Sequence, residues 1–280
     1  MLKIDAHQHF WVFDPIRDQW INEDMSILQD DFMPEHLQPI LAHYGFDGTV
    51  VVQSSELPKE NYFQLQNAEE HQFIKAVVGW VDLRDEDITE QLEEYSRYEK
   101  LKGFRTILQG DEDRSLMLRP AFKRGISQLK RFGFTYDILV LPDQLKYALA
   151  LVAAFPDQPF VLNHIGKPNI RNKDINEWRT DIKALATHEN VYCKVSGMVT
   201  EADNRNWKYE DFKPYLDVIF ESFASNRVIY GSDWPVCRLA ATFGQVVNIL
   251  DSYTATFSKH ERDLFWGGNA VDFYNIKVPV

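Results

Sequence analysis

The chain has 280 residues, of which 45% are hydrophobic and 26% are charged, and its formal net charge at pH 7 is −12. This composition is typical of a water-soluble globular protein, and the negative charge argues against nucleic acid as the main partner, since phosphate binding needs a basic surface. Two cysteines, Cys193 and Cys237, cannot form a disulfide framework, and no basic leader or bilayer-length apolar run is recognisable. We therefore expect a cytoplasmic protein with no membrane partner.

The first stretch, residues 2–10, is predicted to be a short buried strand that ends in two histidines. Side chains two residues apart on a strand point to the same face. His7 and His9 can therefore point into one space at the C-terminal end of this strand. Two imidazoles in that position can bind a metal or donate hydrogen bonds to a carbonyl oxygen.

Seven more apolar runs predict buried strands, and helical stretches alternate with them. The predicted strands cover residues 48–53, 74–83, 101–108, 134–140, 160–166, 191–198 and 227–230. The predicted helices cover residues 61–71, 85–100, 118–132, 144–155, 178–189 and 209–223, after one that opens near Met33 and before a last region from 243 onward. Such alternation favours a parallel sheet covered by helices, and eight units indicate a closed (β/α)8 TIM barrel in one domain, residues 1–280. An open doubly wound sheet is the alternative, but no Gly-x-Gly-x-x-Gly segment follows a strand to support it.

Polar side chains stand at the ends of the predicted strands, where active sites of such barrels lie. In chain order they are His7, His9, Gln53, Trp80, Arg105, Tyr136, Asp137, His164, Lys194 and, after the last strand, Asp233. Each one alone has a structural explanation. Arg105 or Asp137 could belong to an ion pair in the barrel core, and Lys194 could face the helices. Three histidines and one aspartate at the same rim together favour a functional site.

Three segments carry a resemblance to a known family. They are Asp-Ala-His-Gln-His at 5–9, Asn-His-Ile-Gly-Lys-Pro at 163–168 and Gly-Ser-Asp-Trp-Pro at 231–235. These segments resemble the amidohydrolase superfamily and, more narrowly, its amidohydrolase 2 branch. Residues 30–34, 48–53 and 193–197 are similar to the sugar-lactonase group of that branch, which includes hydrolases of L-fuconolactone and L-rhamnonolactone. The resemblance runs from the first predicted strand to the last.

The resemblance implies a hydrolase that opens a 1,4- or 1,5-lactone of a sugar acid. Asp233 is expected to act as the general base that takes a proton from water. His7, His9 and His164 are then expected to polarise the lactone carbonyl and stabilise the oxyanion. We expect Arg105 to hold a ring oxygen, hydroxyl or carboxylate with its fork of donors. Further candidates for binding a polyhydroxylated ring are Gln53, Trp80, Tyr136 and Trp234.

The expected metal content follows from a departure from the superfamily pattern. Metal-dependent members typically add a lysine or glutamate on strand four and a histidine on strand five, where this chain offers Arg105 and then Tyr136 or Asp137. A binuclear site is therefore not expected. One divalent metal, zinc, would have enough ligands in His7, His9, His164 and Asp233. Because some of the similar lactonases work without a metal, we expect that no cofactor is required.

Two other functions are open at this stage. One is a metal-dependent decarboxylase of an aromatic or unsaturated acid, a reaction that the same branch also contains. The other is a barrel that binds a ligand without catalysis, which would leave the convergence of histidines and aspartate unexplained. The sequence leaves the sugar and the oligomeric state open. Ring-binding residues are expected in the loops at 11–31 and 200–207, where Trp11 and Trp20 either line a pocket or pin the loop to the scaffold.

Overall fold

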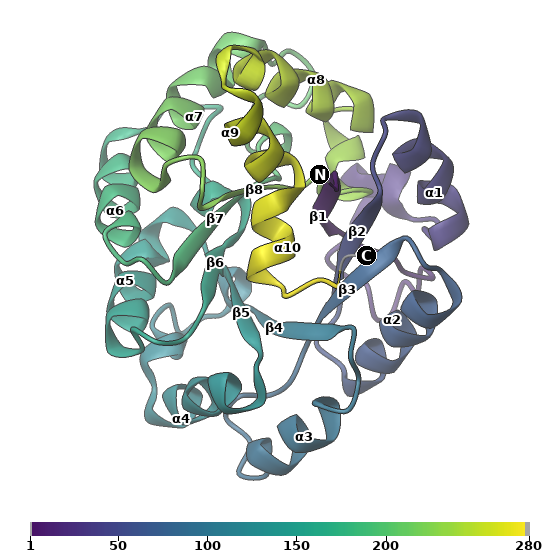
Figure 1. The fold of residues 1–280 in the computed structure, drawn as a ribbon, viewed down its shortest axis with the longest axis vertical. Helices are drawn as coiled ribbons and strands as arrows, with labels where there is room; N and C mark the ends of the chain where they lie inside the picture. Colours follow the sequence, from purple (N-terminus) through teal and green to yellow (C-terminus); the bar gives the residue numbers. More distant parts are fainter. Residues whose placement is uncertain (1, 278–280) are drawn as a thin grey trace.

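The computed structural model describes residues 2–277, and a parallel sheet with sequential strand order β1 to β8 lies at its centre (Figure 1). The strands are β1 Ile4–Gln8, β2 Gly48–Val52, β3 Ile74–Gly79, β4 Leu101–Ile107, β5 Thr135–Leu139, β6 Phe160–Leu162, β7 Val191–Val195 and β8 Val228–Tyr230. A parallel bridge between Gln8 and Trp234 joins the end of β1 to the segment after β8. The predicted (β/α)8 barrel is thereby confirmed; its organisation as one domain stays a prediction.

Helices surround the barrel on the outside (Figure 1). They are α1 Pro34–His43, α2 Pro58–Glu70, α3 Ile88–Tyr95, α4 Pro120–Leu129, α5 Leu145–Ala154, α6 Asn176–Ala186, α7 Tyr209–Phe223 and α8 Phe243–Tyr253. Three of them begin with proline at the first helical position, where the missing N–H costs nothing. The predicted last helical region from residue 243 is in fact divided, because α8 is followed by the short helices α9 Lys259–Asp263 and α10 Asn269–Phe273.

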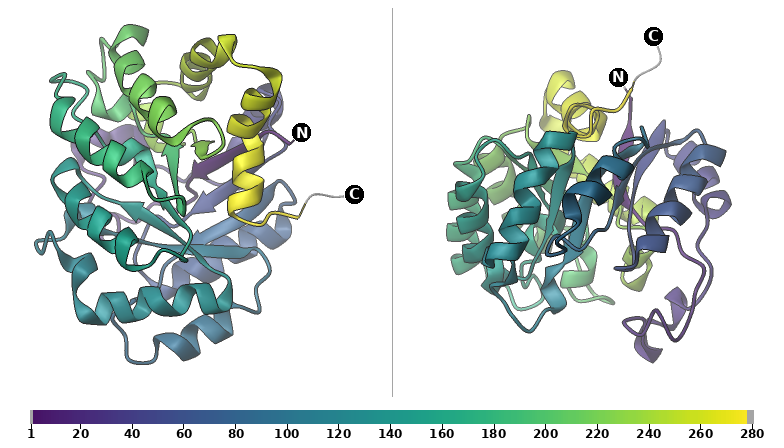
Figure 2. Two further views of the ribbon diagram at one scale, coloured as in Figure 1. Left: turned by 60° about the vertical axis from the view of Figure 1, so that its left-hand side comes forward. Right: turned by 90° about the horizontal axis from the view of Figure 1, so that it is seen from below.

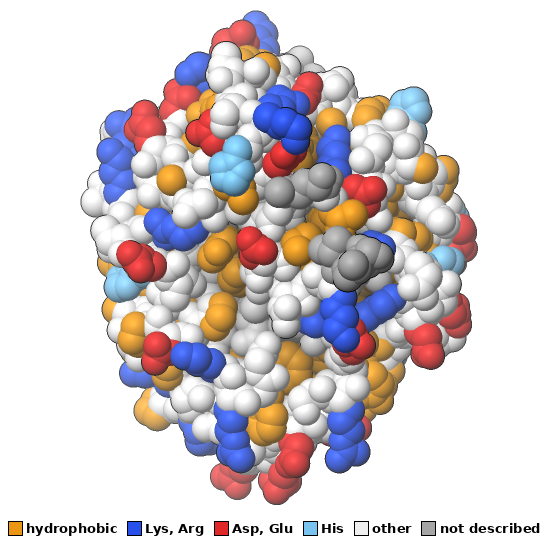
Figure 3. All heavy atoms as spheres, in the orientation of Figure 1, with side chains coloured by type: hydrophobic (Ala, Val, Ile, Leu, Met, Phe, Trp, Pro, Cys, Tyr) orange, Lys and Arg blue, Asp and Glu red, His pale blue; other side chains and the backbone are white. Residues whose placement is uncertain are grey.

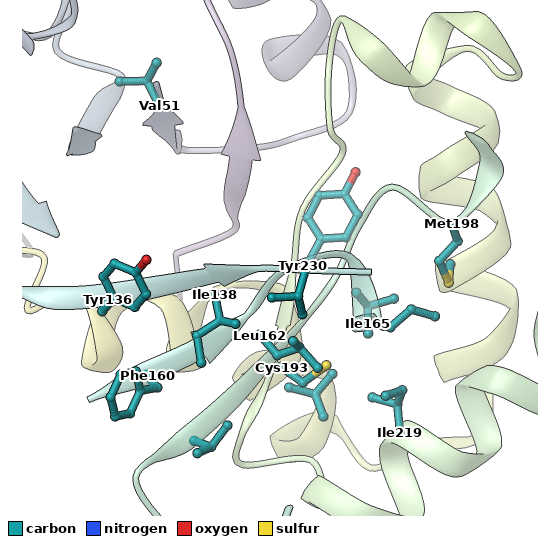
Figure 4. Packing of buried hydrophobic residues seen from close by; sticks show 14 of the residues in the cluster. Val51, Tyr136, Ile138, Phe160, Leu162, Ile165, Cys193, Met198, Ile219 and Tyr230 are labelled. Carbon is teal, nitrogen blue, oxygen red and sulfur yellow. The ribbon is translucent and has the colours of Figure 1, made fainter. Parts of the chain in front are cut away.

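The apolar side chains form two cores, one on each face of the sheet. The larger core fills the space between the strands and the helices, and Figure 4 shows part of it. The smaller core lies inside the barrel, where Val50, Val78 and Ile229 pack with Ala270 and Phe273 of α10. In Figure 1 α10 lies across the middle of the barrel, and in the right-hand view of Figure 2 it lies opposite the purple segment that follows β1. Helix α10 therefore covers one end of the barrel and leaves the other for the site.

Several strands end earlier than the hydrophobic pattern predicts. Strand β6 ends at Leu162, although the predicted strand extends to Gly166. The reason is the backbone, because His164 and Ile165 have φ values of 53° and 49° in the left-handed region, which no strand adopts. Strand β7 likewise ends at Val195 rather than Met198. The residues beyond the true strand ends form the rim of the barrel.

Lysine and arginine side chains are interspersed with aspartate and glutamate on the face shown in Figure 3. Within residues 2–277, no helix combines the length and the apolar character that crossing a membrane requires.

Candidate active site

A cavity of about 380 Å³ opens at the C-terminal ends of the strands, at the end of the barrel opposite α10. Its floor is formed by side chains that the strands and their immediate ends carry: His9, Arg105, His164 and Asp233, with His7 buried beside them. Its wall is formed by loop residues, among them Trp11, Trp20, Met25, Lys167 and Glu201. The volume is within the range of small-molecule sites.

Three histidines surround one carboxylate oxygen on the floor. The distance from Oδ1 of Asp233 to Nε2 is 3.8 Å for His7, 3.4 Å for His9 and 4.0 Å for His164. All four residues are at most 6% exposed. The sequence therefore predicted correctly that these side chains come together.

The local backbone explains how this convergence is reached. His164 and Asp233 have φ values of 53° and 59°, a region that is costly for residues with a side chain and is found at functional sites. Gly197 has a φ of 62°, and a Cβ atom there would lie 2.5 Å from Nδ1 of His164. Because glycine has no Cβ atom, Gly197 makes room for the imidazole ring of His164. A register shift in β1 between Asp5 and Gln8 includes His7, as is common beside active sites.

The floor keeps His7 and His164 neutral and Asp233 charged at neutral pH. Burial lowers the pKa of His164 to about 3, and burial together with the Lys194 charge holds the pKa of His7 well below its usual value. Burial alone would raise the pKa of Asp233, but His164 and His9 outweigh it and the pKa is lowered. A neutral imidazole offers a lone pair, and an ionised carboxylate can accept a proton or bind a cation.

The two ring nitrogens of His9 have different partners, because Nδ1 contacts a backbone oxygen and Nε2 faces Asp233. Nδ1 of His9 lies 2.7 Å from the carbonyl oxygen of Val52, which only accepts, so this nitrogen carries the hydrogen. In the neutral form of this tautomer the Nε2 lone pair points toward Oδ1 of Asp233, which lies 3.4 Å away. Two acceptors that face each other need a proton or a cation between them.

Arg105 is held against the floor and keeps one donor free. Its NH2 group donates to the backbone oxygen and to Oε1 of Gln53, at 2.5 Å and 3.1 Å, and NH1 lies 3.4 Å from Nε2 of His7. The buried Nε of Arg105 has no protein partner among the described residues. Gln53 therefore orients Arg105, and the guanidinium reaches the cavity.

A buried polar network lies between the floor and α10. Nζ of Lys194 donates to Asp137 at 2.6 Å and lies 3.4 Å from Nδ1 of His7, and the Tyr274 hydroxyl donates to Asp137 at 2.9 Å. The suggestion that Lys194 faces the helices is therefore wrong. The suggestion of a core ion pair holds for Asp137, whose partner is Lys194. This network packs under His7 and supports its ring.

Four of the predicted ring-binding residues do not line the cavity, and Gln53 is one of them, because it is fully buried and contacts Arg105. Trp80 is fixed by two backbone hydrogen bonds of 2.7 Å with the side chain of Asn61. Tyr136 lies beside Phe160 in the core between sheet and helices, as Figure 4 shows, because residues 136 and 137 point to opposite faces of β5. Trp234 is 3% exposed and packs edge-on against Phe32.

Residues of the segments 11–31 and 200–207 line the cavity wall, and that they bind a sugar ring stays a prediction. Trp11 is buried and Trp20 is 43% exposed, and their rings meet edge to face on the cavity wall. Thr200, Glu201 and Asn204 line the opposite side. Lys167, which follows β6 and lines the cavity, was not among the predicted site residues. Its place three residues after His164, at the rim, is the signal that could have identified it.

Comparison with known proteins identifies close relatives over the whole chain. The chain is 35% identical to a protein named L-fucono-1,5-lactonase in Burkholderia multivorans, with 99% of this chain and 97% of the relative covered. A protein of the same name in Burkholderia ambifaria is 34% identical, with the same coverage of both chains. The crystal structure of an amidohydrolase from Burkholderia multivorans with bound zinc has a TM-score of 0.95 at 35% identity, covering 99% of this chain and 100% of that chain.

The expectation that no cofactor is required is contradicted by these findings. A relative that is 35% identical contains bound zinc. In the present structure His7, His164 and Asp233 offer ligand atoms that all lie within 4.8 Å of one another, and all three are buried. Two neutral imidazoles and a carboxylate are a donor set that zinc accepts. The expectation was wrong because it followed similar lactonases that work without a metal, although His7, His9, His164 and Asp233 had been identified as enough ligands for one zinc ion.

The family model described as "Amidohydrolase" matches residues 4–276, which extends from the first strand to beyond α10. The matched segment includes every floor residue, the barrel strands and both loops of the cavity wall. The resemblance found on the histidine and aspartate segments is therefore confirmed, and the chain belongs to the amidohydrolase family.

Proposed function

We propose that this protein hydrolyses the lactone of a sugar acid, as an enzyme acting on a carboxylic ester. The observation that carries the proposal is the ionised Asp233, whose Oδ1 lies among three histidine nitrogens on the floor of a cavity of about 380 Å³. The relatives named L-fucono-1,5-lactonase support a sugar-acid lactone, such as L-fuconolactone, as the small-molecule substrate. The decarboxylase alternative gains no comparable support from them.

In this proposal Asp233 removes a proton from the attacking water. Its lowered pKa keeps it ionised at neutral pH, and its position beside the histidines places the base next to the reacting carbonyl. Arg105, which lines the cavity, holds the lactone with its guanidinium in an orientation that Gln53 fixes. Asp233 then passes this proton to the ring oxygen as the bond between that oxygen and the carbonyl carbon breaks, which opens the ring and gives the free sugar acid.

We further propose that His7, His164 and Asp233 hold one divalent metal such as zinc. The metal would supply a Lewis acid for the carbonyl and lower the pKa of bound water. His9 is a candidate fourth ligand, because its Nε2 lone pair faces Oδ1 of Asp233. Nζ of Lys194 lies 3.4 Å from Nδ1 of His7, the ring nitrogen that does not face Asp233.

The test is hydrolysis of a panel of sugar-acid lactones, followed by acid release with a pH indicator. The zinc-loaded protein should open at least one lactone, and the chelated protein should lose most of this activity and regain it with zinc. Absence of lactone turnover by the zinc-loaded protein would refute the proposed reaction. Full activity after verified removal of the metal would refute the metal assignment and leave the lactonase proposal standing.

A further inference from the structure

One ion pair on the cavity wall has no part in the proposed chemistry. Nζ of Lys167 lies 2.9 Å from Oε1 of Glu201, and each side chain is about one fifth exposed. Both residues line the cavity that also contains His164 and Asp233. A cation and an anion therefore stand side by side, facing the space that a substrate would occupy.

The backbone holds both partners in place. Lys167 has a φ of 50° and donates its N–H to the carbonyl oxygen of His164 at 2.8 Å, so its position depends on a floor residue. Glu201 ends the 3₁₀ helix Val199–Glu201, and its carbonyl oxygen accepts the N–H of Arg171 at 3.0 Å. This bond ties the loop after β7 to the loop after β6. The ion pair is therefore assembled before any ligand enters.

The pair keeps hydrogen-bonding capacity for a ligand. A lysine ammonium has three donors, and a carboxylate has about four acceptor positions, so one mutual contact leaves both unsaturated. A hydroxyl group both donates and accepts, and two neighbouring hydroxyls can engage the ammonium and the carboxylate together. A carboxylate on the ligand could bind Lys167 only while Glu201 repels it. The pair therefore suits a neutral polyol better than an anion.

We propose that Lys167 and Glu201 form the subsite that binds adjacent hydroxyl groups of the substrate and selects neutral sugar lactones over lactones that carry a carboxylate. This inference rests on the proposed lactonase function and deepens it, because it assigns specificity to two residues on the wall. Glu201 accepts from one hydroxyl, Lys167 donates to its neighbour, and the ester carbonyl is thereby directed toward Asp233.

The experiment compares three six-membered lactones: a hydroxylated sugar lactone, δ-valerolactone and a lactone with a ring carboxylate. The variants are Glu201→Gln and Lys167→Met, and the control is Lys213→Met, which breaks a surface ion pair with Asp217 at 2.8 Å. Each wall variant should lower kcat/KM for the sugar lactone about tenfold or more, mainly through KM, and affect δ-valerolactone much less. Glu201→Gln should also shift the preference toward the carboxylated lactone. The control should change none of these ratios.

A binding measurement separates this inference from the proposed reaction. An anhydrohexitol has the ring and the hydroxyls but no ester, and its binding is followed by calorimetry on the wild type and on Glu201→Gln. Weaker binding to the variant supports the subsite even if no lactone is hydrolysed, in which case only the proposed reaction fails. Equal binding to both proteins, or an equal loss of turnover on the sugar lactone and δ-valerolactone, overturns the subsite.

Discussion

The floor and the wall of the cavity are built by different means. Floor residues such as His7 and Asp233 are almost completely buried and are positioned by strands and by polar groups beneath them. Wall residues such as Trp20 and Lys167 come from loops and remain partly exposed, and their side chains contact other wall residues, Trp11 and Glu201 respectively. A rigid floor keeps reacting groups at fixed distances, whereas a loop wall can vary in sequence without disturbing the barrel. Changes in the floor should therefore alter rate and stability, and changes in the wall should alter affinity.

The largest expected effect tests the floor directly. Asp233→Asn removes the proposed base while keeping the size of the side chain, so kcat should fall roughly 10²- to 10⁴-fold. Binding of the anhydrohexitol, measured by calorimetry, should stay detectable because the wall is intact. A variant with kcat close to the wild type would remove Asp233 from the mechanism.

The network under the floor should be the next most sensitive. Asp137→Asn leaves Lys194 buried without a charged partner, and breaking a buried pair in this way typically costs about 3–5 kcal/mol. The free energy of unfolding from urea titration measures this cost. Asp143→Asn, which breaks the exposed pair with Arg114, is the control and should cost at most about 1 kcal/mol. Equal losses in the two variants would contradict the contrast between the buried network and the surface.

Lowering the pH should destabilise the metal-free protein, because buried histidines on the cavity floor resist protonation in the folded state. The folded-state pKa of His164 is about 3, below the usual 6.5, so its contribution to stability is complete above pH 6.5 and is lost as the pH falls toward 3. His7 acts in the same direction. Burial raises the pKa of Asp5 to about 7, so its contribution is complete below pH 3.8 and is lost as the pH rises through 7. On acidification His7 and His164 lower the free energy of unfolding, whereas Asp5 raises it. Because two groups lower it and one raises it, stability should fall between pH 6.5 and 5.

Urea unfolding at pH 7 and pH 5 measures this loss of free energy of unfolding. Each of the two histidines contributes up to about 1.4 kcal/mol of loss per pH unit. Asp5→Asn removes the opposing group and should make the loss on acidification larger. Stability that is equal or greater at pH 5 would show that the floor histidines are already protonated in the folded protein.

The smallest expected effect belongs to the wall. Trp20→Ala removes an exposed aromatic face from the cavity and should raise KM about fivefold, equivalent to roughly 1 kcal/mol, with little change in kcat. Tyr62→Ala is a matched control, because Tyr62 is also 43% exposed but lies on α2 outside the cavity. A fall in kcat without a change in KM would place Trp20 with the floor instead of the wall.

The sequence by itself determined the barrel and the floor. Strands buried on both faces appear as continuous apolar runs, and a polar residue that ends such a run must lie at the rim. His7, His9, His164 and Asp233 could be identified in this way because each directly follows or ends an apolar run. Arg105 was found for the same reason.

Only the tertiary structure decided the wall and the support beneath the floor. Tyr136 and Asp137 are neighbours in sequence, but the pleat of β5 sends one toward the helices and the other toward Lys194 inside the barrel. Lys167 reaches the cavity because the backbone is left-handed from His164 onward. This conformation could not be predicted from the sequence, because most of these residues are not glycine. Loop side chains are placed by long-range contacts that local pattern does not encode. The lactone specificity proposed here depends on those contacts.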